Sequence, residues 1–237
     1  MTKKISFYSE NEFIHRSFKS YSPAKNYIPD WYKKSEIWVG SNNNDMTFID
    51  GLPYKAIKQC MPFLDSLTSG YILELWQDVK VEKEYNGRLK FSWFESSFAP
   101  ITGRNSKMAE LLPVPIGCNS DHYVWLLPFG IKTPPGYSML MSHPFNRHDL
   151  PFTTLTAIVD ADSYMVPGGN VPVFFKDGFE GIIPAGTPIV QILPFKRDDW
   201  TSETILDEVG YRSTRFNITK YAVGAYKRFM WSKKKFD

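Results

Sequence analysis

The chain has 237 residues, of which 43% are hydrophobic, 16% aromatic and 22% charged. This composition excludes a disordered chain, a collagen-like chain and a coiled coil, and no apolar run approaches the roughly 20 residues that a membrane-spanning helix needs. The net charge of +3 is uneven, because residues 211–237 carry +7 and leave −4 for residues 1–210. We therefore expect a globular protein with a basic C-terminal end. No apolar stretch follows the first lysines, so we expect no secretory signal.

The first third of the chain predicts little regular structure. Residues 1–50 contain two prolines and a polar stretch at residues 41–45, which indicates an irregular N-terminal arm. The aromatic residues of 23–33 predict that this arm packs on the body. Residues 54–68 predict one or two helical turns, interrupted or restarted by Pro62 and ending at Ser69 and Gly70.

A β-hairpin is predicted between residues 73 and 93. Apolar and polar residues alternate on both sides of Asn86 and Gly87, a dipeptide typical of tight turns. A two-residue loop would place Leu89 opposite Glu84, which sets an apolar side chain against a charged one. An odd loop or a bulge near the turn would bring the apolar faces together, and we favour the bulge.

Residues 115–195 predict a succession of short strands joined by connections rich in proline and glycine. The expected strands are residues 123–127, 137–142, 152–159, 171–175, 180–183 and 188–193. Short strands at such regular spacing are typical of an all-β barrel or sandwich.

The C-terminal end predicts a helix. Apolar residues from Ile218 to Met230 recur with the spacing of an amphipathic helix, and the lysines lie off this stripe. The helix would dock on the body, contact a partner protein or acidic surface, or contact nucleic acid. The regular apolar spacing favours the docked helix.

Together these patterns predict a mainly β fold with a barrel or sandwich core, a β-hairpin, an irregular N-terminal arm and a C-terminal amphipathic helix. Residues 1–112 would form the arm, the short helix and the hairpin, residues 113–200 the core, and residues 201–237 a basic helical segment. We expect one compact unit, because no linker-like stretch separates these parts.

Three motifs follow one another in residues 133–191. TPPGYSMLMS at 133–142 joins a proline–glycine turn to a strand, IVDAD at 158–162 carries two aspartates, and PAGTPIVQ at 184–191 ends on a glutamine. In this order they resemble the β-clip core of the dUTPase and dCTP deaminase superfamily. The whole chain, with PAKNYIPDWY at 23–32 and WSKKK at 231–235, resembles an uncharacterised family encoded by tailed bacteriophages, including phages of marine cyanobacteria. This second resemblance implies a viral origin and assigns no chemistry.

The resemblance to the dUTPase superfamily implies a nucleotide site. The ligand-binding residues that it implies are Ser142, Arg147, Asp160, Asp162, Tyr164 and Gln191. Asp160 would orient or activate water and Gln191 matches a glutamine of the last motif, which makes these two the catalytic candidates. Tyr164 would stack under deoxyribose, and Ser142 and Arg147 would contact a phosphate.

The sequence departs from the superfamily in ways that put catalysis in doubt. The serine-rich phosphate loop is replaced by SHPFNR at residues 142–147, where Pro144 removes a backbone N–H. A glycine-rich C-terminal lid is missing, and residues 171–176 hold no glutamate to serve as the deaminase general base. Asp160 and Asp162 would share one face of a strand, where they either activate water or hold a metal–nucleotide, or else cap the strand end and bond to the following turn. We favour the cap.

Other catalytic classes lack their motifs. No histidine is followed two residues later by a carboxylate, which argues against a non-haem iron oxygenase. A nucleophile elbow, a phosphate-binding Gly-Lys-Thr loop and a dinucleotide fingerprint are also missing. We expect no metal and no cofactor, with Mg²⁺ entering only if a nucleotide is the ligand.

We therefore expect a phage-encoded, non-enzymatic binding or assembly protein built on a degenerate dUTPase-like β-clip. The alternatives are a divergent nucleotide pyrophosphatase and a nucleotide-sequestering protein. Expected partners are a second copy of the chain, as a trimer by analogy alone, a phage structural or host protein, or a small nucleotide, but neither a membrane nor nucleic acid. The expected location is the host cytoplasm during infection or, in the other version of the hypothesis, the virion.

Overall fold

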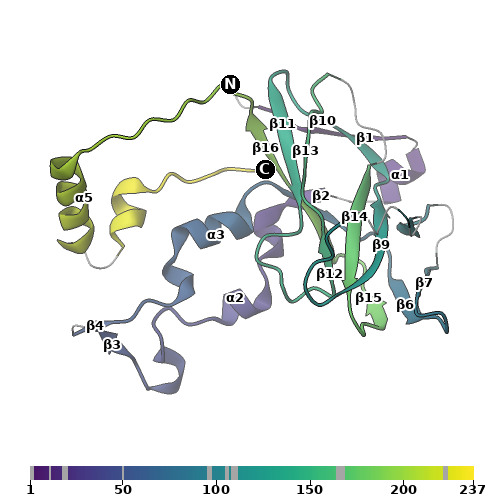
Figure 1. Cartoon of the computed structure of the whole chain (residues 1–237), viewed down its shortest axis with the longest axis horizontal. Coiled ribbons are helices and arrows are strands. Elements are labelled where there is room, and N and C mark those ends of the chain that lie inside the picture. The colour runs from purple at the N-terminus through teal and green to yellow at the C-terminus, as the bar shows by residue number, and fades with distance from the viewer. Residues whose placement is uncertain are drawn as a thin grey trace.

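The structure is a computed structural model, and it describes residues 3–10, 12–17, 21–49, 51–94, 98–104, 107, 112–163, 169–220 and 224–237 (Figure 1). It contains 35% strand and 21% helix, so the prediction of a mainly β protein is confirmed. Antiparallel sheets form a β body on one side, and helical elements project from it on the other. Among the described residues no sheet closes into a barrel.

Two principal sheets make up the β body. The first has the strand order β13 (Ala157–Val159), β11 (Tyr137–Ser142), β16 (Pro188–Lys196), β5 (Tyr71–Glu74) and β2 (Tyr21–Pro23). The second has the order β12 (Phe152–Thr154), β14 (Asn170–Lys176), β9 (Cys118–Leu126) and β8 (Ile101–Gly103). The strand predicted at residues 152–159 is therefore two strands, because the chain passes from one sheet to the other between β12 and β13.

Three smaller sheets complete the strand inventory of the described residues. Their strands are β15 (Gly181–Ile183), β6 (Val79–Lys83) and β7 (Leu89–Ser92) in one sheet, β1 (Ser6–Ser9) and β10 (Phe129–Lys132) in another, and β3 (Phe48–Ile49) and β4 (Leu52–Pro53) in the last. The first strand of the hairpin predicted between residues 73 and 93 is interrupted, since β5 and β6 belong to different sheets.

The core lies where apolar side chains of the two principal sheets meet in one buried cluster. Trp125 of β9 has no exposed surface, and its ring centroid lies 5.1 Å from that of Phe152 and 5.9 Å from that of Phe175. Met139 of β11 and Ile192 of β16 enter the cluster from the other sheet and are also fully buried. Because full burial of such a side chain is worth about 1.5–3 kcal/mol, this cluster holds the sheets together.

The β6–β7 hairpin is present, and the length of its turn decides which side chains lie opposite each other. Val81 lies opposite Phe91, so the apolar faces coincide. The turn has an odd length at residues 85–87, where Gly87 adopts a left-handed φ of 86°. The odd loop, which the sequence left open as the alternative to the favoured bulge, therefore brings the apolar faces together, and β6 pairs with β7 from Lys80–Ser92 to Lys83–Leu89 without a register shift.

The N-terminal residues are more regular than the sequence predicts. β1 pairs with β10 and β2 pairs with β5, and helix α1 (Glu12–Ser17), the 3₁₀ turn η1 (Ala24–Tyr27) and helix α2 (Asp30–Lys34) lie around them. The prediction of an irregular arm is wrong at these places. The physical reason is that strands of three or four residues are too short for a periodic pattern and take their extended form from pairing.

The helix predicted near residue 60 is present. The 3₁₀ turn η3 (Ile57–Gln59) leads into helix α3 (Met61–Thr68), which starts with Pro62 in its first turn and ends at Ser69. Gly70 has a φ of 78°, and a Cβ there would stand 2.0 Å from the carbonyl oxygen of Ile192. Only glycine fits this close approach of α3 to β16.

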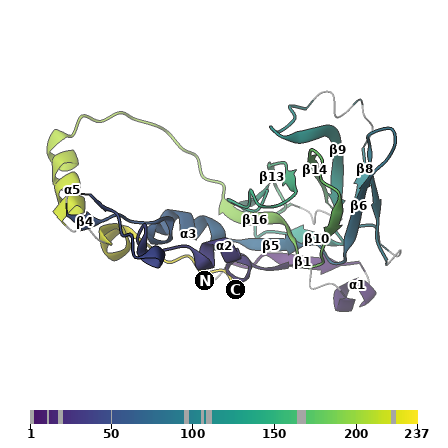
Figure 2. The same ribbon diagram turned by 90° about the horizontal axis from the view of Figure 1, so that it is seen from below.

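The C-terminal helix is present, but it is displaced from the predicted residues and is not docked. Helix α5 (Glu208–Lys220) stands away from the β body in both views, and a π-helical turn, η4 (Tyr226–Met230), follows it (Figures 1 and 2). Phe216 of α5 is 65% exposed. Gly224, with a φ of 77°, separates the two elements, so the apolar stripe of the sequence does not lie on one continuous helix.

None of the helices in the described ranges is both long enough and apolar enough to cross a membrane.

Candidate functional site

Strand β11 divides the predicted ligand-binding residues into two groups. Ser142, at the C-terminal end of the strand, lies directly opposite Gln191 of β16. Ser138, near the N-terminal end, donates a hydrogen bond to Asp160 at 2.5 Å. Four residues of extended strand span roughly 13 Å. The group around Ser142 and the group around Asp160 therefore lie at opposite ends of one strand and do not line a common pocket.

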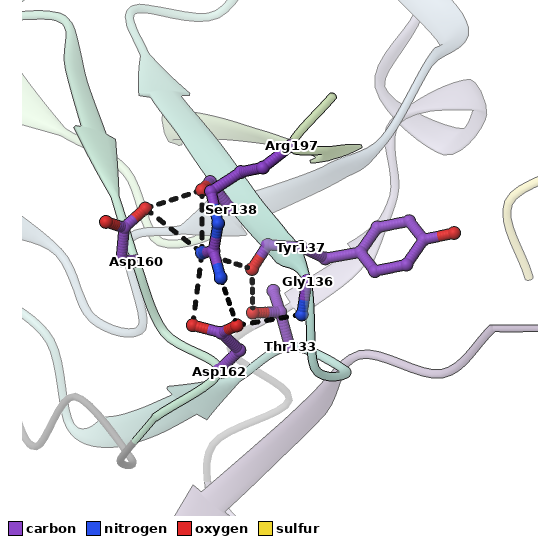
Figure 3. A network of polar contacts seen from close by, with 7 residues as sticks. All are labelled: Thr133, Gly136, Tyr137, Ser138, Asp160, Asp162 and Arg197. Atoms are coloured by element: carbon purple, nitrogen blue, oxygen red, sulfur yellow. Dashed lines mark hydrogen bonds and ion pairs between the residues drawn. The ribbon is translucent and has the colours of Figure 1, made fainter. Parts of the chain in front are cut away.

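Arg197, which follows β16, holds the first group together (Figure 3). Its Nη1 lies 3.3 Å from Oδ1 of Asp160 and 3.1 Å from Oδ1 of Asp162, while its Nη2 contacts Oδ2 of Asp162. The same Nη1 is 3.1 Å from Oγ of Ser138. The Asp162 side chain is only 7% exposed. Both candidate carboxylates therefore contact one cation of the chain itself, which pairs most closely with the buried Asp162 and leaves the Asp160 side chain 66% exposed.

This ion pair controls the charge of Asp162. Hydrogen bonds from the Arg197 guanidinium, and then from the backbone N–H of Gly136 at 2.8 Å, hold the pKa of Asp162 well below its ordinary value of 3.8. The hydrogen bond to Asp162 likewise raises the pKa of Arg197. Asp162 is therefore an anion throughout the neutral range, where a general acid or base needs a pKa near the working pH.

The proline–glycine turn before β11 completes the network. Gly136 has a φ of 79°, donates its N–H to Asp162 and accepts the N–H of Arg197 at 2.9 Å. Thr133 Oγ1 donates to the carbonyl of Tyr137 at 2.7 Å, and the Tyr137 ring points away from the carboxylates (Figure 3). The two carboxylates thus bond to β11 and to the turn before it, whereas the sequence favoured a cap bonded to the turn after the aspartates, most of which lies outside the described residues.

Gln191 forms the centre of the second group. It is 2% exposed, and its Oε1 accepts the backbone N–H of Phe145 at 2.8 Å. Its Nε2 donates to the carbonyls of Ser66 and Ser69 at 2.9 and 2.7 Å, at the C-terminal end of α3. These three bonds join α3, β16 and the loop after β11. The side-chain amide that the resemblance assigned to a ligand is thus fully used inside the protein.

Ser142 and Arg147 also have partners within the chain. Ser142 Oγ and Thr156 Oγ1 lie 3.0 Å apart. Arg147 forms a two-pronged pair with Asp149, with both Nε–Oδ1 and Nη2–Oδ2 at 2.9 Å. A phosphate would have to compete with this carboxylate for the guanidinium.

His143 lies beneath the same loop. Its Nδ1 accepts the N–H of Thr154 at 3.3 Å, which leaves Nε2 to donate to the carbonyl of Arg147 at 3.0 Å. Burial lowers the pKa of His143. The ring is therefore a neutral structural link between β12 and the loop.

Tyr164, the last predicted ligand residue, lies outside the described residues. Among the side chains that the structure does describe, no three of His, Cys, Asp or Glu converge as a metal site. The key residue that sequence reasoning missed is Arg197. Its signal is its position directly after a strand that pairs with β11, which places it beside the proline–glycine turn.

Comparison with models of known protein families finds no match to this chain, and comparison with curated proteins finds none either. The likeness to the phage family and to the dUTPase superfamily stays a prediction.

Proposed function

We propose that this protein is a non-enzymatic binding or assembly protein whose β-clip-like core has lost the nucleotide chemistry of the superfamily it resembles. One observation carries this proposal: every predicted ligand residue within the described part of the chain already has an internal partner. Arg197 forms ion pairs with Asp160 and Asp162, while Gln191 joins α3 to β16 by hydrogen bonds. A nucleotide would have to break these contacts before it could bind.

The likeness to a family encoded by tailed phages supports an origin in a virus, and with it a role in the particle or in the infected cell. Mass spectrometry of purified particles from the encoding phage separates the two locations. Peptides of the chain at a fixed stoichiometry support a structural role in the particle. Their absence, with the protein present in infected cells, supports a role in the cytoplasm.

The part of the molecule that suits assembly is the C-terminal segment, which we define as residues 198–230. It leaves the β body at Arg197 and returns at Trp231, whose Nε1 donates to Asp65 of α3 at 2.9 Å. Beyond it, Lys234 also binds Asp65 at 2.7 Å and Asp237 pairs with Lys25 at 2.6 Å. The C-terminal segment is therefore held at both ends while its middle stands away from the body (Figure 2).

Apolar side chains of the C-terminal segment face solvent. Leu206 is 89% exposed and Val209 80% exposed, and Phe216 lies two helical turns beyond Val209. An isolated 13-residue helix is marginal in water, so α5 needs a surface on which to bury these side chains. Charge of opposite sign divides this segment: residues 198–210 carry five carboxylates and no cation, whereas α5 carries Arg212, Arg215 and Lys220 against Glu208. The second copy of this chain is the occupant we propose, with the exposed apolar side chains of α5 buried between the copies and the basic residues of α5 in one copy beside the acidic residues 198–210 of the next.

The test is the molar mass in solution, measured by light scattering during gel filtration. We expect the wild-type protein to be an oligomer and Val209→Asp/Phe216→Asp to be a monomer with an unchanged circular dichroism spectrum of the β body. Ile116→Asp/Tyr85→Asp is the matched control, because both of its side chains are fully exposed on the β body. A monomeric wild type at micromolar to millimolar concentration contradicts the assembly role, as does an oligomer that survives the α5 variant.

The enzyme alternative is tested separately. Thermal melting with deoxynucleoside triphosphates and cyclic nucleotides, each with and without Mg²⁺, should show no rise in Tm and chromatography no turnover. A ligand at 100 times its Kd would add about 2.7 kcal/mol, which is readily detected. Turnover that Asp160→Asn abolishes would overturn our proposal in favour of the pyrophosphatase, and binding without turnover would favour sequestration.

A further inference from the structure

A pocket of about 410 Å³ lies away from the predicted ligand residues, on the N-terminal side of the β body. Phe7 of β1, Phe129 of β10 and Tyr21 of β2 contribute aromatic walls to it, and Glu74 comes from the end of β5. These strands belong to two different sheets, so the pocket lies where the β1–β10 ribbon meets the edge of the first principal sheet.

The aromatic walls are built into the packing of the two sheets. The rings of Phe7 and Tyr21 are stacked with centroids 3.7 Å apart and an angle of 11° between their planes. Phe129 meets them edge-on, at 5.7 Å from Phe7 and 6.3 Å from Tyr21. Phe129 is buried, whereas Tyr21 is 45% exposed, so the pocket has a fixed wall inside and an accessible ring at its mouth.

Glu74 supplies a negative charge to this pocket. The Tyr27 hydroxyl donates a hydrogen bond to Oε2 of Glu74, and burial together with this bond raises the pKa of Tyr27, which therefore stays protonated. Within the described ranges, no lysine, arginine or histidine forms an ion pair with Glu74, and His15 lies exposed in the pocket lining. Within the part of the chain that the structure describes, the Glu74 carboxylate thus lies beside aromatic side chains without a paired cation.

A carboxylate and several aromatic rings around one cavity attract the same class of ligand. The ring faces carry negative charge density that stabilises an alkylated ammonium group, and the carboxylate compensates its charge. An anion would meet repulsion from Glu74, and a neutral apolar ligand would leave that charge unpaired. We propose that this pocket binds an alkylammonium group, with Glu74 as the counter-ion and Phe7, Tyr21 and Phe129 as its aromatic walls.

The first experiment is a two-dimensional ¹H–¹⁵N NMR titration of the full chain with choline and, in parallel, with 3,3-dimethylbutan-1-ol, its uncharged analogue of the same shape. We expect choline to shift signals of residues in β1, β2 and β10 and to bind about tenfold or more tighter than the alcohol. N-acetyl-lysine methylamide is titrated in the same way. Tighter binding of choline indicates a free ammonium ligand, and tighter binding of the lysine compound indicates a protein side chain.

Variants measure the contributions of the Glu74 charge and of the aromatic walls to binding separately. Glu74→Gln should weaken choline binding about fivefold or more and leave the alcohol unaffected. Glu82→Gln is the matched control, because Glu82 is a carboxylate at the end of another strand, away from the pocket, and should change nothing. Phe7→Leu keeps an apolar wall but removes a ring, so it tests the aromatic contribution even if Glu74→Gln does not fold. Equal affinity for choline and the alcohol, or no binding of either ammonium compound, overturns the proposal.

Discussion

The β body buries its large apolar side chains, whereas the C-terminal segment leaves its large apolar side chains exposed to solvent. In the β body, Trp125 and Phe175 have no exposed surface and contact each other across the core. In the C-terminal segment, Trp200 is 87% exposed and Leu206 89% exposed. The body therefore draws its stability from its own packing, whereas the segment is fixed mainly at its two ends. From this contrast we infer that the apolar side chains of the C-terminal segment are buried by another molecule and not by the β body of the same chain.

The sharpest test of this contrast compares two tryptophans. Trp125→Ala should lower the free energy of unfolding by about 3–5 kcal/mol, because it removes a large buried side chain and leaves a cavity. Trp200→Ala makes the same chemical change at an exposed position and should alter it by less than about 0.5 kcal/mol in the dilute monomer. Urea denaturation followed by circular dichroism measures both. Similar losses in the two variants would show that the C-terminal segment is packed in the monomer.

A second test concerns the joint between α3 and the sheet. Gln191→Leu should destabilise the fold by about 2–4 kcal/mol, since it leaves the N–H of Phe145 and two carbonyls of α3 buried without partners. Gln59→Leu is the control, because Gln59 makes a single exposed hydrogen bond to Ile37. It should cost about 1 kcal/mol or less. If Gln191→Leu is as stable as the control, the amide is available to a ligand after all.

The pH dependence of stability tests the junction where the C-terminal segment leaves the body. The pKa of Asp162 is depressed in the folded protein, so the unfolded chain binds its proton first as the pH falls. The stabilisation is complete above about pH 5 and is lost progressively as the pH drops below the ordinary value of 3.8. In Arg197→Leu, the loss of stability that accompanies protonation of Asp162 at low pH should be smaller. Melting curves between pH 2 and pH 7 measure it, and identical profiles would show that the ion pair does not stabilise the fold.

The smallest change in the free energy of unfolding is expected from a substitution in α5. Phe216→Ser should change the unfolding free energy of the dilute protein by less than about 0.5 kcal/mol, because the side chain contacts water there. At high protein concentration the same change should lower the Tm, since assembly adds stability by mass action. Melting curves at several concentrations reveal this difference. A Tm independent of concentration for the wild type would argue against assembly through α5.

Local patterns predicted the local elements well. The strand at residues 137–142, the helix that begins beside Pro62 and the hairpin turn at Gly87 follow from alternation, a proline and a glycine turn. They were predictable because each depends on neighbouring residues. The strands β1 and β2 were not, since they are short edge strands that depend on pairing with distant partners.

The candidate site could likewise be predicted only in part, because its contacts join residues that are far apart in the sequence. The sequence pointed to Asp160, Asp162 and Gln191, and it favoured a structural cap for the two aspartates. It gave no means of seeing that Arg197 would reach both carboxylates, across 37 and 35 positions of the chain. Nor did it reveal the pocket around Glu74, whose aromatic walls come from three separate strands.

By itself, the sequence determined the mainly β character, the positions of most central strands and the uneven charge, because periodicity, turn residues and composition are properties of neighbouring residues. The tertiary structure alone decided which side chains formed ion pairs, which apolar residues stayed in water and where a carboxylate with no ion pair among the described residues lay beside aromatic rings. Each of these depends on which distant strands pair, and that choice is made by the packing of the whole core around residues such as Trp125 and Phe175.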